Sequence, residues 1–169
     1  TFSRSPILKV LGDGGILTSP KVTREHLGQG RVVWTVDSGL AGPTIGLTAN
    51  IHGDESIPAN FVDGCSEVPN FTESMAKAEQ LFTDTLLAVS PDFQTELGYE
   101  KDRYGEANLS LASKWVGNTY ECLSLTLEMP FKDHDPLPDP ITGWSPERAK
   151  ILGADVLYPI YQVINAKLA

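Results

Sequence analysis

The chain has 169 residues, with 13 Lys and Arg against 22 Asp and Glu, which gives a formal net charge of −9. This acidic balance excludes the basic surface that a nucleic-acid-binding protein usually needs. With 41% hydrophobic and only 21% charged residues, the chain has the composition of one folded domain, or of one domain with a small extension, and not of a disordered tail.

The sequence contains no run of 18 or more apolar residues, and its polar beginning, TFSRSP, lacks the apolar stretch of a signal peptide. We therefore expect no membrane-spanning helix. Cys65 and Cys122 form neither a disulfide framework nor a CxxC metal site, which favours a reducing compartment and predicts a cytoplasmic location.

The first fifty residues predict β-structure. The runs RVVWTV (31–36) and TIGLTANI (44–51) are β-branched and apolar, and the segment DSGLAGP between them is typical of a turn. We expect the two runs to neighbour each other in a sheet, with 44–51 as a buried strand that ends at His52. Residues 1–43 are predicted as a β-rich N-terminal segment and 44–169 as the main domain.

A long helix is predicted over residues 71–89. Asn70 with Glu73 three positions later suggests a capping box, and Ser90 with Pro91 predicts the helix end. Apolar side chains recur at three- and four-residue spacings, which predicts a core-facing stripe made of Phe71, Met75, Ala78, Phe82, Leu86 and Val89.

Two further helices are expected. A shorter one covers about residues 108–116. The last begins at Ser145 as N-cap and Pro146 at its first position and runs towards Leu168, and Pro159 is expected to kink or split it.

The segment ECLSLTLEMP (121–130) alternates leucines with polar residues and predicts a strand with one apolar face. The alternation places Glu128 on the face opposite the leucines, just before Pro130 ends the strand. The proline-rich segment 133–144 predicts an ordered surface loop. Strands that alternate with helices indicate an α/β fold with a mixed sheet flanked by helices.

His52 and Glu55 form an HxxE pair directly after the predicted strand. Both are zinc ligands by type, and Asp54 could orient the imidazole. A lone HxxE also arises by chance, and His52 alone is as well explained by a hydrogen bond at a strand end. Glu128 adds a second carboxylate at a strand end, where a general base for a zinc-bound water would stand; the alternative is a structural salt bridge.

Several blocks in order resemble the C-terminal half of the M14 zinc carboxypeptidases, in the bacterial cytosolic carboxypeptidase-like branch. The blocks are HGDESIPANFVDG (52–64), SPDFQTELGYEKD (90–102), ANLSLAS (107–113), LSLTLEMPFKD (123–133) and GWSPERAKILG (143–153). The resemblance implies a mixed α/β fold, a zinc cofactor held by two histidines and a glutamate, Glu128 as general base and His52 as a zinc ligand. Residues 44–169 would then be a partial catalytic domain.

One departure from that family concerns the ligand set. The family needs an early HxxE motif and a later histidine, whereas this chain has a single block, whose upstream part resembles the succinylglutamate desuccinylase and aspartoacylase group. Either the chain is a C-terminal piece, or a deletion has merged two motifs. For a third ligand, His26 lies in a polar stretch and is expected to be a solvated turn residue. His134, in the proline-rich loop, is close enough in sequence to approach the site, but an exposed position is expected for it, and neither is chosen.

Tyr99, Arg103 and Tyr104 precede the strand of Glu128. By the resemblance, a tyrosine that closes over substrate could stand at Tyr99 or Tyr104, with ordinary packing as the alternative for each. Arg103 could bind a substrate carboxylate. Arg148 could also bind a carboxylate, but its place in GWSPER favours local pairing at a helix start.

The sequence thus predicts a zinc-dependent metallocarboxypeptidase-like hydrolase that cleaves a C-terminal peptide or amino-acid amide bond. One alternative is a catalytically incomplete remnant acting as a non-enzymatic domain, and another is an N-acyl-amino-acid amidohydrolase. The expected partner is a peptide or amino-acid-derived substrate, with neither nucleic acid nor membrane. A homo-oligomer would be required if a subunit interface supplied the missing ligand.

Overall fold

The computed structural model describes residues 21–28, 31–37, 42, 44–47 and 57–166. The chain divides into two units, Thr1–Ala49 and Asn50–Ala169.

The first unit contains an antiparallel pair of strands. β1 (Lys21–Gly28) pairs with β2 (Arg31–Asp37) from Lys21 opposite Asp37 to Gly28 opposite Arg31. The strand predicted at 31–36 is confirmed by β2. Its partner β1 was not expected, because KVTREHLG is mostly polar and lacks the apolar alternation that predicts a strand.

The buried strand predicted at 44–51 is wrong for its described part. Residues 44–47 form no strand, and Ile45 and Leu47 are 51% and 75% exposed. Residues 44–47 have no ladder partner among the described residues of their unit, in which β2 pairs with β1. Residues 48–51 lie outside the described residues.

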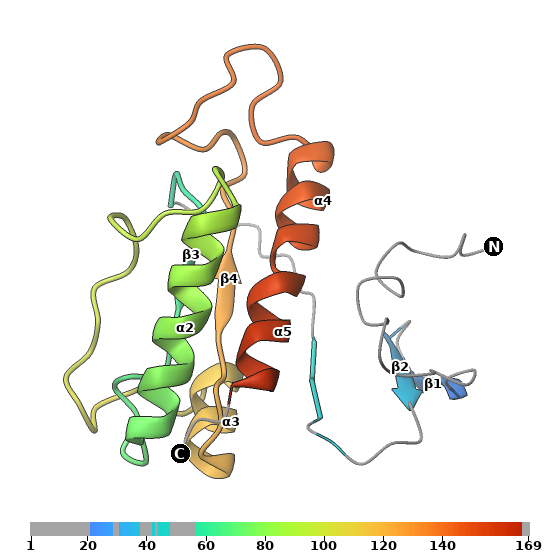
Figure 1. Ribbon diagram of the computed structural model, residues 1–169, viewed down its shortest axis with the longest axis vertical. Helices are drawn as coiled ribbons and strands as arrows, with labels where there is room; N and C mark the ends of the chain where they lie inside the picture. The colour runs from blue at the N-terminus through green and yellow to red at the C-terminus, as the bar shows by residue number, and fades with distance from the viewer. Residues whose placement is uncertain (1–20, 29–30, 38–41, 43, 48–56, 167–169) are drawn as a thin grey trace. The chain divides into compact units, whose positions relative to one another are not determined.

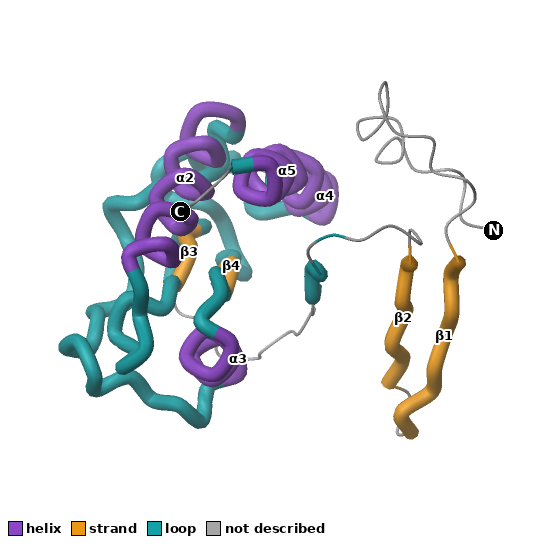
Figure 2. The backbone as a smooth tube through the Cα atoms, turned by 60° about the horizontal axis from the view of Figure 1, so that its bottom comes forward, coloured by secondary structure: helices purple, strands orange, loops and turns teal. Residues whose placement is uncertain are grey.

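The second unit is a small antiparallel sheet between helices. β3 (Phe61–Asp63) pairs with β4 (Thr126–Glu128), with Phe61 opposite Glu128 and Asp63 opposite Thr126. The helices are α2 (Glu73–Val89), α3 (Ala112–Tyr120), α4 (Pro146–Asp155) and α5 (Leu157–Asn165). Figures 1 and 2 show α2 and α5 on one side of the two strands and α3 on the other. The predicted α/β class is confirmed.

The apolar core lies between the sheet and the helices α2, α4 and α5. Phe82, Leu86, Phe93 and Leu152 are buried there, and the strand residues Val62 and Leu127 pack against them. Leu123 and Leu125 join the same cluster, so the predicted apolar face of 121–130 is confirmed, although the ladder itself covers only Thr126–Glu128.

Helix α2 confirms the predicted helix and most of its buried stripe, with Met75, Ala78, Phe82 and Leu86 buried. Val89, predicted for the same stripe, is 37% exposed at the helix end, and Phe71 lies before the helix. The predicted capping box is wrong, because the N-cap is Thr72, whose hydroxyl accepts from the Met75 amide at 3.2 Å. Asn70 is instead held by Asn118, to which its backbone amide and its side-chain Nδ2 both donate. The helix ends at Ser90, as predicted.

The other helices differ from expectation mainly at their ends. α3 begins at Ala112 and not near 108, because the Asn108 carboxamide oxygen accepts from Ser110 and holds a turn before it. α4 has Ser145 as N-cap, as predicted, and Pro159 splits the last helix: it has no amide to give to Asp155, and the break falls just ahead of it at Val156. None of the described helices is long and apolar enough to cross a membrane.

Candidate functional site

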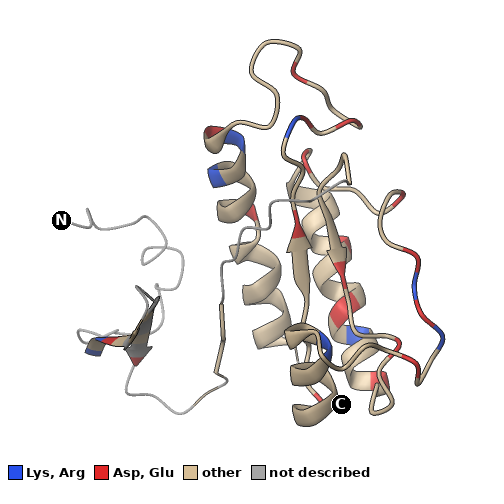
Figure 3. Cartoon of the chain, turned by 180° about the vertical axis from the view of Figure 1, so that it is seen from behind, with Lys and Arg blue, Asp and Glu red and all other residues tan. Residues whose placement is uncertain are grey.

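Glu128 is the last residue of β4 and is partly exposed. Because side chains alternate along a strand, its carboxylate lies on the face opposite Leu127 and the apolar core. That face also carries α3, since Thr126 Oγ1 donates to Ser113 Oγ at 3.0 Å. Figure 3 shows acidic positions on both strands of this sheet. The carboxylate therefore stands at a strand end outside the core.

Phe61 lies directly across the ladder from Glu128, on the same face of the sheet. Its buried ring meets Tyr99 edge to face, with ring centroids 5.0 Å apart and an interplanar angle of 87°. Gly98 makes this approach possible, because a Cβ there would lie only 3.1 Å from the Phe61 ring. Sequence reasoning did not predict β3, so Phe61 was missed as the residue that brings Tyr99 towards the face of Glu128.

Tyr99 also lines a hollow of about 550 Å³ between α2 and the loop that follows it. Its walls combine aromatic rings with acidic side chains and one lysine, among them Phe61, Phe71, Glu79, Glu96 and Lys101. Gln94 shapes the loop, because its Oε1 accepts from the amides of Glu96 and Leu97 and its Nε2 donates to the Leu97 carbonyl oxygen.

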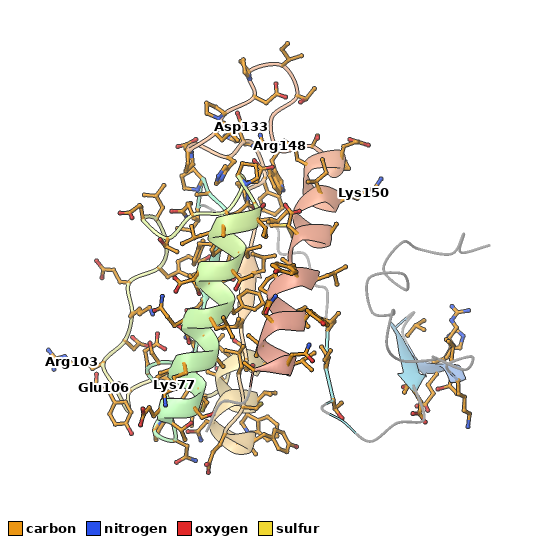
Figure 4. All side chains as sticks on the ribbon, viewed as in Figure 1. Lys77, Arg103, Glu106, Asp133, Arg148 and Lys150 are labelled. Atoms are coloured by element: carbon orange, nitrogen blue, oxygen red, sulfur yellow. The ribbon has the colours of Figure 1, made fainter. Side chains whose placement is uncertain are left out.

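Arg103 and Tyr104 lie further along that loop. Figure 4 shows Arg103 at the end of the unit where Lys77 and the start of α2 lie, and Asp133 and Arg148 at the other end. Tyr104 is 67% exposed, and its hydroxyl donates to the Pro69 carbonyl oxygen at 2.7 Å. Of the three residues predicted to bind substrate, the structure thus brings Tyr99 next to the strand partner of Glu128.

His134 is fully buried, which corrects the expectation of an exposed loop histidine. Its Nδ1 accepts from the backbone amide of Asn60 at 3.1 Å. The loop comes to this place because Asp135 donates its amide to the Pro58 carbonyl oxygen, 2.8 Å away. Burial lowers the pKa of His134. Sequence reasoning had no signal for this contact, since its partners are 74 positions apart. His26, the other described histidine, is exposed as expected, but it lies in strand β1 and not in a turn.

Arg148 is occupied by other side chains. Its guanidinium pairs with Asp92 and donates to Asp133 Oδ1 at 3.2 Å and to the Leu137 carbonyl oxygen at 2.8 Å. It also lies over the Trp144 ring, 5.1 Å from its centroid. Arg148 is therefore paired, but with residues far along the chain and not locally, and it holds the loop 133–144 onto α4. That loop is ordered, as predicted.

A second charged cluster lies on the α3 side of β3. The buried Lys114 ammonium is 3.1 Å from Asp63 Oδ1 and 3.0 Å from Glu67 Oε2, and it also donates to the Gly64 carbonyl oxygen. Burial alone would lower the pKa of Lys114, but its bonds to Glu67 and Asp63 raise it above the usual value. All three ammonium protons are satisfied, so this cluster fastens α3 to the sheet and is structural.

The predicted zinc ligands His52 and Glu55 lie outside the described residues. Within the described ranges, no group of three or more His, Cys, Asp or Glu side chains could hold a metal ion. Cys65 and Cys122 are both free thiols. A site with three such ligands would therefore need at least one donor from outside the described residues; His52 and Glu55 are of the types that zinc binds.

No protein-family model matches the chain. An uncharacterized protein of Zymomonas mobilis is 42% identical over 121 residues, which are 72% of this chain and 32% of that protein. A metallo-carboxypeptidase from Pseudomonas aeruginosa, solved in complex with (2-guanidinoethylmercapto)succinic acid, is 47% identical with a TM-score of 0.64, covering 68% of this chain and 30% of its own. A metallo-carboxypeptidase from Burkholderia cenocepacia is 48% identical with a TM-score of 0.63 and the same coverage.

The chain spans about a third of the length of these relatives. Over roughly two thirds of its own length it is similar, in sequence and in fold, to metallo-carboxypeptidases.

Proposed function

We propose that the chain provides the general-base part of a zinc-dependent metallocarboxypeptidase-like hydrolase, which cleaves a C-terminal peptide or amino-acid amide bond. One observation carries the proposal: Glu128 ends β4 on the face away from the core, opposite Phe61, in a segment similar to metallo-carboxypeptidases at 47–48% identity. The cytosolic branch of the family and a cytoplasmic location belong to the same proposal.

In this proposal Glu128 takes a proton from the attacking water and later passes it to the leaving amine. The strand end holds the carboxylate at one place, and its partial exposure leaves it accessible to water. His52 and Glu55 are the residues that would hold zinc, and the ion would act as a Lewis acid towards the scissile carbonyl.

Substrate binding is assigned to Tyr99, Arg103 and Tyr104. Tyr99 is best supported, because its ring packs on Phe61 and borders the hollow beside α2. Arg103 and Tyr104 are exposed on the same loop, where they could meet the more distant part of a peptide. The compound bound by the Pseudomonas protein carries carboxylates and a guanidinium, so it serves as a binding probe for this assignment.

The test replaces Glu128 by Gln, with Glu106→Gln as a matched control at an exposed carboxylate of the loop. Release of the C-terminal amino acid is measured over a panel of N-blocked dipeptides. We expect Glu128→Gln to lose about 100-fold or more in rate, to keep its affinity for (2-guanidinoethylmercapto)succinic acid, and Glu106→Gln to match the parent chain. A Glu128→Gln protein with undiminished turnover would refute the role of Glu128.

A catalytically incomplete remnant is the second candidate, and it is favoured by the single HxxE block, His52 to Glu55, in a chain that resembles a family needing a further histidine. It predicts neither turnover nor probe binding in a folded protein. The chain could still be active as an oligomer if a second subunit supplied the missing ligand. Specific activity should then fall on dilution, and a specific activity that is independent of protein concentration would contradict such an assembly.

A further inference from the structure

The hydrogen bond of His134 defines its protonation state. A backbone amide can only donate, so the Nδ1 atom that accepts from Asn60 carries no proton, and the single ring proton resides on Nε2. The imidazole is therefore neutral. Its Nε2 is buried and has no hydrogen-bond partner among the described residues, so Nδ1 makes the hydrogen bond of the ring, which also lies 6.3 Å from the Trp144 ring between centroids.

The amide that His134 holds lies where the strand pairing stops. The ladder ends at Phe61 opposite Glu128, so the amide of Asn60 lies beyond the last pair. It donates its hydrogen bond to the imidazole of His134. Asn60 is fully buried, and its side-chain Nδ2 donates to the Asp92 carbonyl oxygen at 2.8 Å. Gln94 Nε2 donates to the Asn60 carbonyl oxygen at 2.9 Å. Asn60 thus links the sheet, the loop after α2 and the loop of His134 through its hydrogen bonds.

Four charged groups act on the His134 imidazole. Asp92 comes from the loop after α2, Arg148 from α4, and Asp133 and Asp135 from the histidine's own loop. Arg148 pairs with both Asp92 and Asp133, and Asp133 Oδ1 also accepts from the backbone amide of His134 at 2.8 Å. Burial outweighs the attraction of these carboxylates and lowers the pKa of the imidazole.

We propose that His134 is a positioning residue that holds residues 57–60, which lead into β3, through its bond to Asn60. This bond is the lock, and protonation of Nδ1 opens it. A protonated Nδ1 can no longer accept from Asn60, and it would place a charge in a fully buried site. The lock itself rests on the contacts of His134 and Asn60. Only its relevance to the site rests on the proposed function.

The direction of the pH effect follows from the lowered pKa. The unfolded chain takes up the proton near pH 6.5, about the usual pKa of histidine, whereas the folded chain resists it. The contribution of His134 to stability is therefore complete above about pH 6.5 and declines as the pH falls towards the lower pKa of the folded state. Within that window the unfolding equilibrium constant rises by up to about tenfold for each unit by which the pH falls.

The test measures urea unfolding between about pH 7.5 and about pH 5, the range in which histidine titrates, for the parent chain, His134→Asn and His26→Asn. The carboxamide oxygen of Asn can take the place of Nδ1 and accept from Asn60, but it does not titrate. We expect His134→Asn to remain folded at neutral pH and to lose the histidine part of the pH slope, while His26→Asn, at an exposed β1 position, keeps the parental slope.

A second readout uses the unaltered chain. Nitrogen NMR of the imidazole should show His134 as the Nε2–H tautomer at neutral pH, and the Asn60 amide should be protected from hydrogen exchange until the pH falls through the titration. A parental slope in His134→Asn, or a proton found on Nδ1, would overturn the lock. Neither readout needs turnover, so a failed lock leaves the Glu128→Gln test intact, and an inactive chain still tests the lock.

Discussion

Phe61 of β3 stands directly opposite Glu128 of β4, and the same Phe61 ring packs edge to face against Tyr99, 5.0 Å between centroids. One buried side chain therefore connects the proposed general base with a proposed substrate-binding residue. The connection is made of packing, so it should respond to changes in side-chain volume.

Replacing Phe61 by Ala removes this packing and leaves a cavity. Because Phe61 is 4% exposed, we expect the free energy of unfolding to fall by about 3–5 kcal/mol, measured by urea denaturation. Phe131→Ala is the control, since that ring is 50% exposed on the loop after β4 and its loss should change stability by only about 0.5 kcal/mol. Equal effects of the two changes would contradict the packing role of Phe61.

The second stability prediction concerns the buried Lys114. Lys114→Met leaves Asp63 and Glu67 without their buried partner and should cost about 3–5 kcal/mol of unfolding free energy. Lys77→Met, which breaks an exposed pair with Glu73, should leave the free energy of unfolding almost unchanged.

The pH dependence of that effect has a definite sign. Since the folded pKa of Lys114 is raised, its contribution is complete below the unfolded pKa of about 10.4 and is lost as the pH rises through the folded pKa. The difference between the parent chain and Lys114→Met should thus be constant across neutral pH and shrink in strong alkali. If this stability difference between the parent chain and Lys114→Met were already absent near neutral pH, the account would be contradicted.

Cys65 is predicted to be chemically inert in the folded chain. Burial raises its pKa to about 11, and its thiol donates to the Ser124 carbonyl oxygen at 2.8 Å. At mildly alkaline pH a thiol reagent should therefore modify the partly exposed Cys122 and leave Cys65 unreacted, whereas urea should make both react. Mass spectrometry of the labelled peptides identifies the site, with Cys122→Ser as control; rapid native labelling of Cys65 would contradict the prediction.

Features that depend on neighbours in the sequence were predicted well. The spacing of Met75, Phe82 and Leu86 predicts α2 and its buried face, and the missing amide of Pro159 predicts a break in the last helix. The alternation of the leucines around Leu125 predicts which face of β4 meets the core. In each case the cause is local: helix periodicity, strand alternation or the chemistry of one residue.

Features that depend on distant partners were not predictable in this way. His134 is buried because Asn60 and Pro58 reach it from another part of the chain, and Arg148 finds Asp92 and not a neighbour on its helix. β1 is a strand because β2 pairs with it, although its own composition is polar. For the candidate site, the position of Glu128 was predictable from alternation, whereas Phe61 opposite it was not.

Zinc content per chain tests the central claim most directly. Elemental analysis is made on protein purified without chelator or added metal, for the parent chain, His52→Ala and Glu128→Gln. The proposed hydrolase predicts about one zinc per chain in the parent and in Glu128→Gln, and its loss in His52→Ala, because His52 binds the ion and Glu128 does not. A folded parent chain without zinc would contradict the account and leave Glu128 with no activated water to deprotonate.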